Sequence, residues 1–95
     1  MIIVRRSEKG FTVSGHAGYA PHGQDIVCAA VSTLLQGFLL SIEELTADEL
    51  NTDIGAGYAL IEYGNLSAKG TVLVDSFFVA MKMVADEFPD YVRVE

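Results

Sequence analysis

Apolar and polar residues alternate in two short segments near the start of the chain, which is the pattern of β-strands. These segments are Ile2–Arg6 and Phe11–Gly15. The residues between them end in Gly10, and a glycine supplies the permissive backbone that a tight turn needs. We therefore predict a hairpin, and alternation along its second strand places His16 on the polar face.

Apolar residues then recur at spacings of three and four from about Asp25 to Leu45, which predicts a helix with one face toward the core. Residues 17–24 contain two glycines and a proline and are predicted to form a loop before this helix. Asp25 is a natural N-cap. The predicted core face of the helix comprises Val27, Val31, Leu34, Phe38, Ile42 and Leu45.

The second half of the chain is predicted to contain a further hairpin, a helix and a strand. A second hairpin is predicted from Thr52–Ile54 and Tyr58–Tyr63, turning at residues 55–57, and residues 64–70 are interpreted as flexible. A second helix, Thr71–Glu87, is stopped by Pro89, and a short strand closes the chain at Tyr91–Glu95. The predicted apolar side of this helix comprises Leu73, Phe77, Ala80, Met81, Val84 and Phe88, and Met83 is also interpreted as core packing.

The resulting order, ββαββαβ, predicts an α+β fold in which two helices pack on an antiparallel or mixed sheet. The 95 residues are expected to form one domain, 1–95, without linkers or repeats. Since 51% of the residues are hydrophobic and the helical layer is thin, we expect a homodimer that covers some of the apolar surface.

Charge and hydropathy narrow the setting in which the chain works. Thirteen acidic and six basic residues give a net charge of −7, which argues against direct nucleic-acid binding and is compatible either with a basic peptide partner or with solubility alone. The longest uncharged stretch, Ile26–Ile42, is interpreted as too polar and slightly too short to span a membrane. The start of the chain does not resemble a secretory signal, so a cytoplasmic protein is expected.

His16 and Cys28, the only cysteine, have the parts of a cysteine-nucleophile site. Cys28 falls in the first turn of the predicted helix, where Asp25, Cys28 and Ser32 form a polar stripe. The helix dipole contributes only about 0.3–1 kcal/mol there, and the carboxylate of Asp25 disfavours a thiolate. His16 is therefore the partner most needed to keep the thiol ionised, and N–H groups of the first helical turn are candidates to receive an oxyanion.

Other interpretations of the same residues remain open from spacing alone. A free cysteine is most often a small buried hydrophobe. His16, His22, Asp25 and Cys28 match no familiar zinc spacing, so no metal is expected, and His22 is most simply a solvated loop residue. There is no phosphate-binding loop or dinucleotide fingerprint, and no cofactor is expected.

The His16–Cys28 segment resembles the ribosomal-processing cysteine protease family, Prp. The resemblance implies an endopeptidase that removes a short N-terminal extension from a large-subunit ribosomal protein. It implies Cys28 as nucleophile and His16 as general base, Gly15, Asp25 and Ser32 in supporting positions, a homodimer, and a mobile loop at residues 17–24. The alternative is a non-enzymatic ribosome-associated or protein-binding module with a structural cysteine. The matching segments are GHA (15–17), DIVCAAVS (25–32) and FPDYV (88–92).

Overall fold

A computed structural model describes all residues, 1–95. Its elements follow the predicted order ββαββαβ, and its two helices pack on one mixed sheet, so the predicted fold class is confirmed. The elements are β1 (Ile2–Ser7), β2 (Gly10–Ser14), α1 (Ile26–Leu45), β3 (Leu50–Gly55), β4 (Tyr58–Tyr63), α2 (Ala68–Glu87) and β5 (Val92–Val94).

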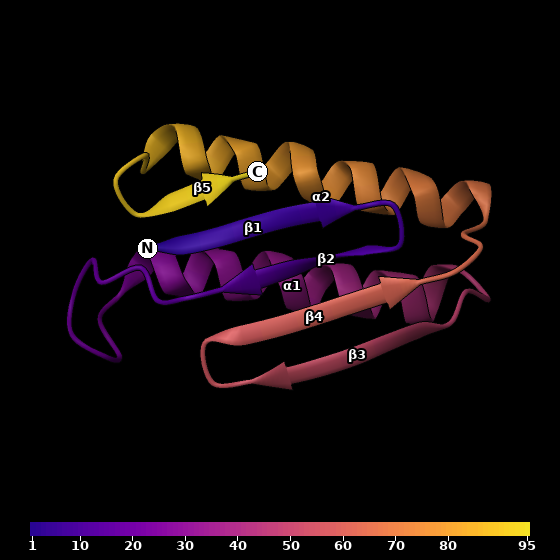
Figure 1. Ribbon diagram of the computed structural model, residues 1–95, viewed down its shortest axis with the longest axis horizontal. Coiled ribbons are helices and arrows are strands. Elements are labelled where there is room, and N and C mark those ends of the chain that lie inside the picture. Colours follow the sequence, from indigo (N-terminus) through magenta and orange to yellow (C-terminus); the bar gives the residue numbers. More distant parts are fainter.

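The five strands form one sheet in the order β3-β4-β2-β1-β5. The pair β1–β5 is parallel and the other neighbours are antiparallel. Both helices lie on the same side of the sheet, with α1 behind β2 and β4 in the view of Figure 1. The opposite side of the sheet carries no helix, and the start of α1 lies near the end of β2, beside the loop of residues 17–24 (Figure 1).

Phe11 of β2 joins the sheet to both helices. Its ring centroid lies 5.5 Å from that of Phe38 on α1, and 4.7 and 5.3 Å from those of Phe77 and Phe78 on α2. Aromatic pairs at these separations add to the stability gained from burial alone. The side chains that cover the sheet thus belong to one hydrophobic cluster.

Several details of the helices differ from the prediction. On α1 the buried position is Leu35, with Leu34 only partly buried, whereas Leu45 at the helix end is 58% exposed. On α2 the neighbours Val74 and Phe78 are buried, whereas Met83 is 65% exposed because Met81 and Val84 already occupy the core face. The interpretation of Met83 as a core residue was therefore wrong.

Two elements also begin earlier than predicted. Helix α2 starts at Ala68, inside the stretch interpreted as flexible, because Ser67 caps it by accepting a hydrogen bond from the N–H of Gly70 at 3.0 Å. Asp48 holds this cap in place by accepting a 2.7 Å hydrogen bond from the Ser67 hydroxyl. Strand β3 starts at Leu50 because that residue pairs with Tyr63.

Gly10 is needed for a different reason from the one predicted. Its φ is not in the left-handed region. A Cβ at this position would instead overlap the carbonyl oxygen of Ile61 on β4. The requirement for glycine comes from the close approach of two strands, not from the turn.

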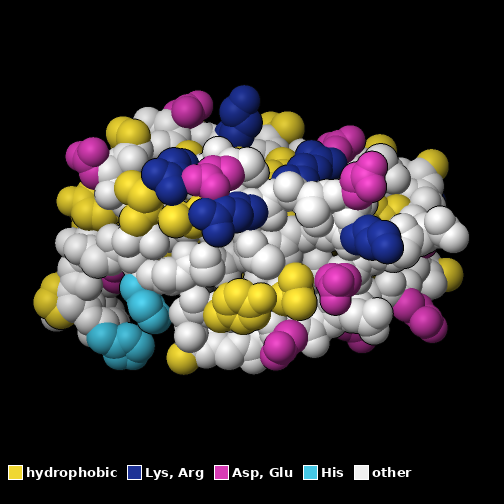
Figure 2. All heavy atoms as spheres, viewed as in Figure 1, with side chains coloured by type: hydrophobic (Ala, Val, Ile, Leu, Met, Phe, Trp, Pro, Cys, Tyr) yellow, Lys and Arg dark blue, Asp and Glu magenta, His cyan; other side chains and the backbone are white.

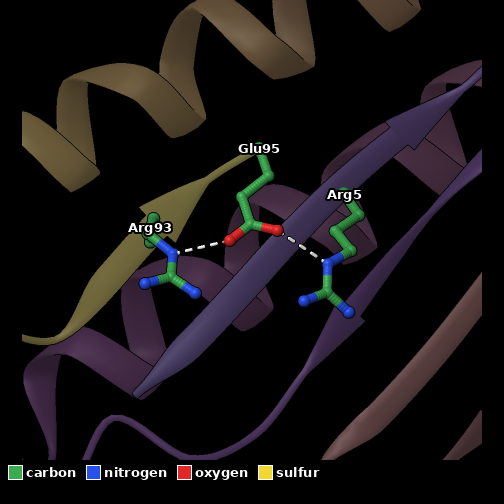
Figure 3. Close-up of polar contacts among 3 residues, drawn as sticks. All are labelled: Arg5, Arg93 and Glu95. Carbon is green, nitrogen blue, oxygen red and sulfur yellow. Dashed lines mark hydrogen bonds and ion pairs between the residues drawn. The ribbon is translucent and has the colours of Figure 1, made fainter.

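An ion-pair cluster occupies the open side of the sheet (Figure 3). Glu95 accepts from Arg5 of β1 and from Arg93 of β5, each at 2.7 Å. Hydrogen bonding to Arg5 is the main cause that keeps the pKa of Glu95 below its ordinary value. The cluster links the two parallel strands, and because all three side chains are substantially exposed its contribution to stability is small and sensitive to salt.

Helix α1 is long and apolar enough, by length and composition alone, to cross a membrane. This finding contradicts the prediction that the stretch is too polar and slightly too short. In the structure its buried face, which includes Val27, Val31 and Phe38, packs in the hydrophobic cluster with the sheet and α2. That arrangement is the one expected of a core helix.

Candidate active site

Cys28 lies in the first turn of α1, where Asp25 holds the start of the helix. The Oδ1 atom of Asp25 accepts hydrogen bonds from the backbone N–H groups of Val27 and Cys28, at 3.0 and 2.9 Å. The prediction that Asp25 is the N-cap is therefore confirmed. The thiol is half-buried, and its Sγ atom accepts a hydrogen bond from the backbone N–H of Ala17 at 3.4 Å.

His16 follows the end of β2, beyond a bend at Gly15. Gly15 has a φ of 96°, and a Cβ at this position would overlap the carbonyl oxygen of Met1, so the bend requires a glycine. The N–H of Gly15 donates to the carbonyl of Gly57 at 2.9 Å, and the Met1 ammonium donates to the carbonyl of His16 at 2.6 Å. These contacts fix the backbone that carries the imidazole.

Two neighbouring hollows meet at the thiol. One, of about 460 Å³, lies under the loop of residues 17–24, and the other, of about 410 Å³, lies between α1 and the tip of the β3–β4 hairpin. The second is the more apolar. The two hollows together form one surface depression, and in Figure 2 the two histidine side chains lie next to one another at its edge. The residues that line both hollows are His16, His22, Cys28 and Ser32.

The structure places His16, Cys28 and Ser32 on the walls of the same two hollows. No hydrogen bond joins the imidazole of His16 to the thiol, and the side chains of His16 and Ser32 make no hydrogen bond to any other group of the chain. These polar groups are therefore available to a bound molecule. A thiol and an imidazole around one depression can serve as the nucleophile and the base of an acyl transfer.

Asp25 supports this region without hydrogen bonding to His16. Its second oxygen, Oδ2, accepts from the backbone N–H of Tyr19 at 3.0 Å, so one carboxylate ties the loop to the helix. The N–H of Cys28 is the main cause that keeps the pKa of Asp25 below its ordinary value. The Tyr19 ring also packs against Phe88 and Tyr91, with centroids 5.8 and 5.2 Å apart.

Asp25 engages three of the backbone N–H groups at the start of α1. The N–H groups of Val27 and Cys28 donate to the Asp25 carboxylate, and the N–H of Ala29 donates to the Asp25 carbonyl at 3.1 Å. The cap that starts the helix uses these donors, so an oxyanion would compete with Asp25 for them. The N–H of Ala17 is the backbone donor that the structure directs at the sulfur.

Two features of the site were missed from the sequence. His22 was interpreted as a solvated loop residue, and although exposed it lines both hollows. The turn between β3 and β4 was considered only as a turn, yet residues 54–59 form one wall of the second hollow. The glycines at 55 and 57 signalled the turn but not its location, because the pairing of β4 with β2 is not encoded in local periodicity.

The residues around the thiol include groups that bind metal ions in other proteins. His16, His22, Asp25 and Cys28 were the residues considered as a zinc set. The structure groups no three histidine, cysteine or acidic side chains in an arrangement that could hold a metal ion.

Comparison with known proteins places this chain in a family. The sequence model of the family described as cysteine protease Prp matches residues 1–93. The ribosomal processing cysteine protease Prp of Bacillus subtilis is 32% identical over 96% of this chain and 91% of its own length. The protein of the same name from Mycoplasma pneumoniae is 32% identical over 100% of this chain and 94% of its own length.

The fold agrees with solved structures of the same family. The crystal structure of the essential ribosomal processing protease Prp from S. aureus, in complex with a covalently linked product peptide, superimposes with a TM-score of 0.91. It is 20% identical in sequence and covers 99% of this chain and 95% of that chain. With the family match along nearly the whole sequence, this likeness leads to one conclusion: the chain belongs to the ribosomal-processing cysteine protease family, Prp.

Proposed function

We propose that this cysteine protease removes a short N-terminal extension from a large-subunit ribosomal protein in the cytoplasm, with Cys28 as nucleophile and His16 as general base. The observation that carries the proposal is that the thiol and the imidazole line the same two hollows. A peptide chain can extend from the thiol into each of these hollows. Relatives along the full length are named ribosomal processing proteases, which supports this substrate class.

The reaction follows from ordinary thiol chemistry. The Cys28 sulfur, as thiolate, attacks the carbonyl carbon of the scissile peptide bond while His16 carries the proton. When the tetrahedral intermediate collapses, the C–N bond breaks and His16 gives its proton to the leaving amine. Water then attacks the thioester carbon while His16 takes a proton from that water. The C–S bond breaks, the carboxylic acid product leaves, and the released thiolate of Cys28 is left beside protonated His16.

The supporting residues have separate tasks in this proposal. Asp25 fixes the helix start and the loop around the thiol. Gly15 makes the bend that brings His16 beyond the end of β2. The hydroxyl of Ser32, one helical turn after Cys28, is free to hydrogen-bond to the substrate backbone.

The two hollows and the charge of the chain indicate how a peptide substrate is held. Solved S. aureus Prp structures carry a substrate peptide or a covalently linked product peptide. Here the hollow under the loop and the more apolar hollow beside the hairpin meet at Cys28, so a peptide can occupy both while its scissile bond lies at the sulfur. The net charge of −7 favours the approach of a basic protein such as a ribosomal protein.

The decisive experiment incubates the protein with candidate large-subunit ribosomal proteins and detects cleavage by mass spectrometry. Cys28→Ala is expected to abolish cleavage while the circular dichroism spectrum stays unchanged, and Cys28→Ser is expected to be nearly inactive because a hydroxyl is a far weaker nucleophile. Thr52→Ala, at an exposed position of β3 that lines none of these hollows, is the control and should cleave normally. Cleavage should also survive a metal chelator. Normal activity of Cys28→Ala would show that the nucleophile is another group.

We also propose that the protein forms a homodimer through the outer face of its helices. A hollow of about 240 Å³ lies between α1 and α2 on that face and is lined partly by small side chains. Large apolar residues stand exposed on the same two helices, where a second copy would cover them. These residues are Leu40, Leu45, Val72, Val79 and Met83.

A further inference from the structure

Gly57 in the turn between β3 and β4 is in direct contact with the side chain of His16. A Cβ built on Gly57 would lie 2.5 Å from the Nε2 atom of His16, 3.0 Å from Cε1 and 3.3 Å from Cδ2. The imidazole therefore occupies the volume that any side chain at position 57 would need. The two residues are 41 positions apart in the sequence and meet because β4 pairs with β2.

The backbone around this contact is held independently of the imidazole. Gly57 has a φ of 70°, which L-residues rarely adopt, and its carbonyl accepts the N–H of Gly15, the residue before His16. The turn is thus fixed to the same bend that carries the histidine. Glycines elsewhere in the loops lack such a neighbour, since Gly55 and Gly64 have nothing within 4 Å of a built Cβ.

Cysteine–histidine sites usually orient the base through a hydrogen bond to a third group. The imidazole of His16 has no hydrogen-bond partner in the chain, and the carboxylate of Asp25 is engaged by the backbone of Tyr19, Val27 and Cys28. What remains to place the ring is its packing. The atoms of Gly57 are packed directly against the ring, and Nε2 is the ring atom nearest to the side-chain position that Gly57 leaves empty.

We propose that Gly57 is a positioning residue for His16: because this turn has no side chain at position 57, it leaves the space that the imidazole of the general base occupies. The inference rests on the proposed role of His16. A methyl group at position 57 must displace the imidazole, because the opposing atoms belong to the ring and the turn is tied to Gly15. A displacement of about 1 Å in a catalytic group can lower the rate by about 100-fold.

The test compares Gly57→Ala with Gly64→Ala, a glycine in open space outside both hollows. Peptide cleavage and iodoacetamide alkylation of Cys28 are measured as functions of pH, with urea unfolding as the measure of stability. We expect Gly57→Ala to lower kcat by about 10- to 100-fold with little change in KM, and to slow alkylation near pH 6. Gly64→Ala should match the wild type in both assays.

A double-mutant cycle separates positioning from general damage. If Gly57 acts through the imidazole, then Gly57→Ala should have no further effect on alkylation in the His16→Ala background. An equal slowing in both backgrounds, an unchanged rate, or a faster rate in Gly57→Ala alone would overturn the inference. Because L-alanine at a φ of 70° is strained, Gly57→Asn provides a second variant that tolerates this backbone and still introduces a Cβ.

The position of the ring can also be followed without activity. The chain has two histidines, so the His22→Ala variant assigns the imidazole resonances of His16 in NMR spectra. Gly57→Ala and Gly57→Asn should shift the resonances of His16, and unchanged resonances would overturn the inference. Failure of the proposed function is recognised separately. Equal alkylation rates in the wild type and in His16→Ala would show that His16 is not the base, whatever the effect of Gly57→Ala.

Discussion

The backbone N–H of Ala17 donates to the Sγ of Cys28 across 3.4 Å, which ties the residue after the histidine directly to the thiol. The segment that follows β2 therefore touches the first turn of α1, although eleven positions separate the two residues along the chain. This contact brings the segment that carries His16 to the sulfur without a hydrogen bond between the two side chains.

His16→Ala should greatly slow the alkylation of Cys28 near pH 6. A protonated imidazole beside the sulfur favours the thiolate, and a thiol without such a partner is mostly protonated at this pH. The measurement is the rate of iodoacetamide addition followed by mass spectrometry. His22→Ala should have a smaller effect, because the N–H that reaches the sulfur belongs to Ala17, the residue after His16, whereas His22 lies five residues further along the loop. Equal rates for wild type and His16→Ala would show that the two residues do not form a pair.

Asp25→Ala should lower the stability of the fold without lowering the reactivity of the Cys28 thiol. The substitution removes acceptors for the N–H groups of Tyr19, Val27 and Cys28, so the urea midpoint should fall. Alkylation near pH 6 should stay at least as fast as in the wild type, because Asp25 makes no hydrogen bond to His16 and its negative charge opposes the thiolate. A large fall in alkylation with an unchanged urea midpoint would contradict this division of roles.

The same residue predicts how stability depends on pH. The pKa of Asp25 is lowered in the folded state, so its contribution is fully present above the ordinary aspartate pKa of about 4 and is lost as the pH falls through the lower folded value. Wild type should therefore lose more stability than Asp25→Asn between about pH 5 and pH 3. Parallel curves in urea titrations at each pH would show that the carboxylate is not preferentially stabilised in the fold.

Two glycine substitutions should change stability in opposite directions. Gly10→Ala forces a Cβ against the carbonyl of Ile61 in the neighbouring strand and should cost more than about 3 kcal/mol. Gly37→Ala, in the middle of α1 with open space around it, should add about 0.8–1 kcal/mol. Urea unfolding measures both changes in stability. Equal changes for the two variants would mean that neither the helix propensity at position 37 nor the close contact between strands at position 10 determines the result.

The proposed dimer is checked by sedimentation at micromolar concentration. The wild type should have the mass of two chains, and Val79→Asp should be monomeric because a charge on the 72% exposed valine would be buried between helices. Arg5→Ala, on the open side of the sheet, should leave the mass unchanged and serves as the matched control. A monomeric wild type would argue against association through any face.

Features that depend on residues close together in the sequence could be predicted. The Asp25 cap, the strand that ends before His16 and the placement of Cys28 in the first turn follow from residue types at short spacings. Contacts between distant segments were not, because period and propensity do not specify which strands become neighbours. Gly57 and the tip of the second hairpin reached the site only through the pairing of β2 with β4.

The same limit explains the errors of assignment. Met83 is as hydrophobic as Met81, and only the position of α2 on the sheet decides which of them is buried. The start of α2 depended on Asp48, which lies 19 residues before the Ser67 cap that it holds.

The position of β1 has a consequence for the newly made chain. β1 pairs with β2 on one side and, on the other, with β5, whose residues are synthesised about ninety positions later. Until Val92–Val94 has been made, the outer edge of β1 offers unpaired N–H and carbonyl groups to other chains. The nascent protein is thus open to wrong strand pairing until β5 has been made. Although His16 and Cys28 are translated early, the sheet on which α1 packs is completed only when β5 pairs with β1.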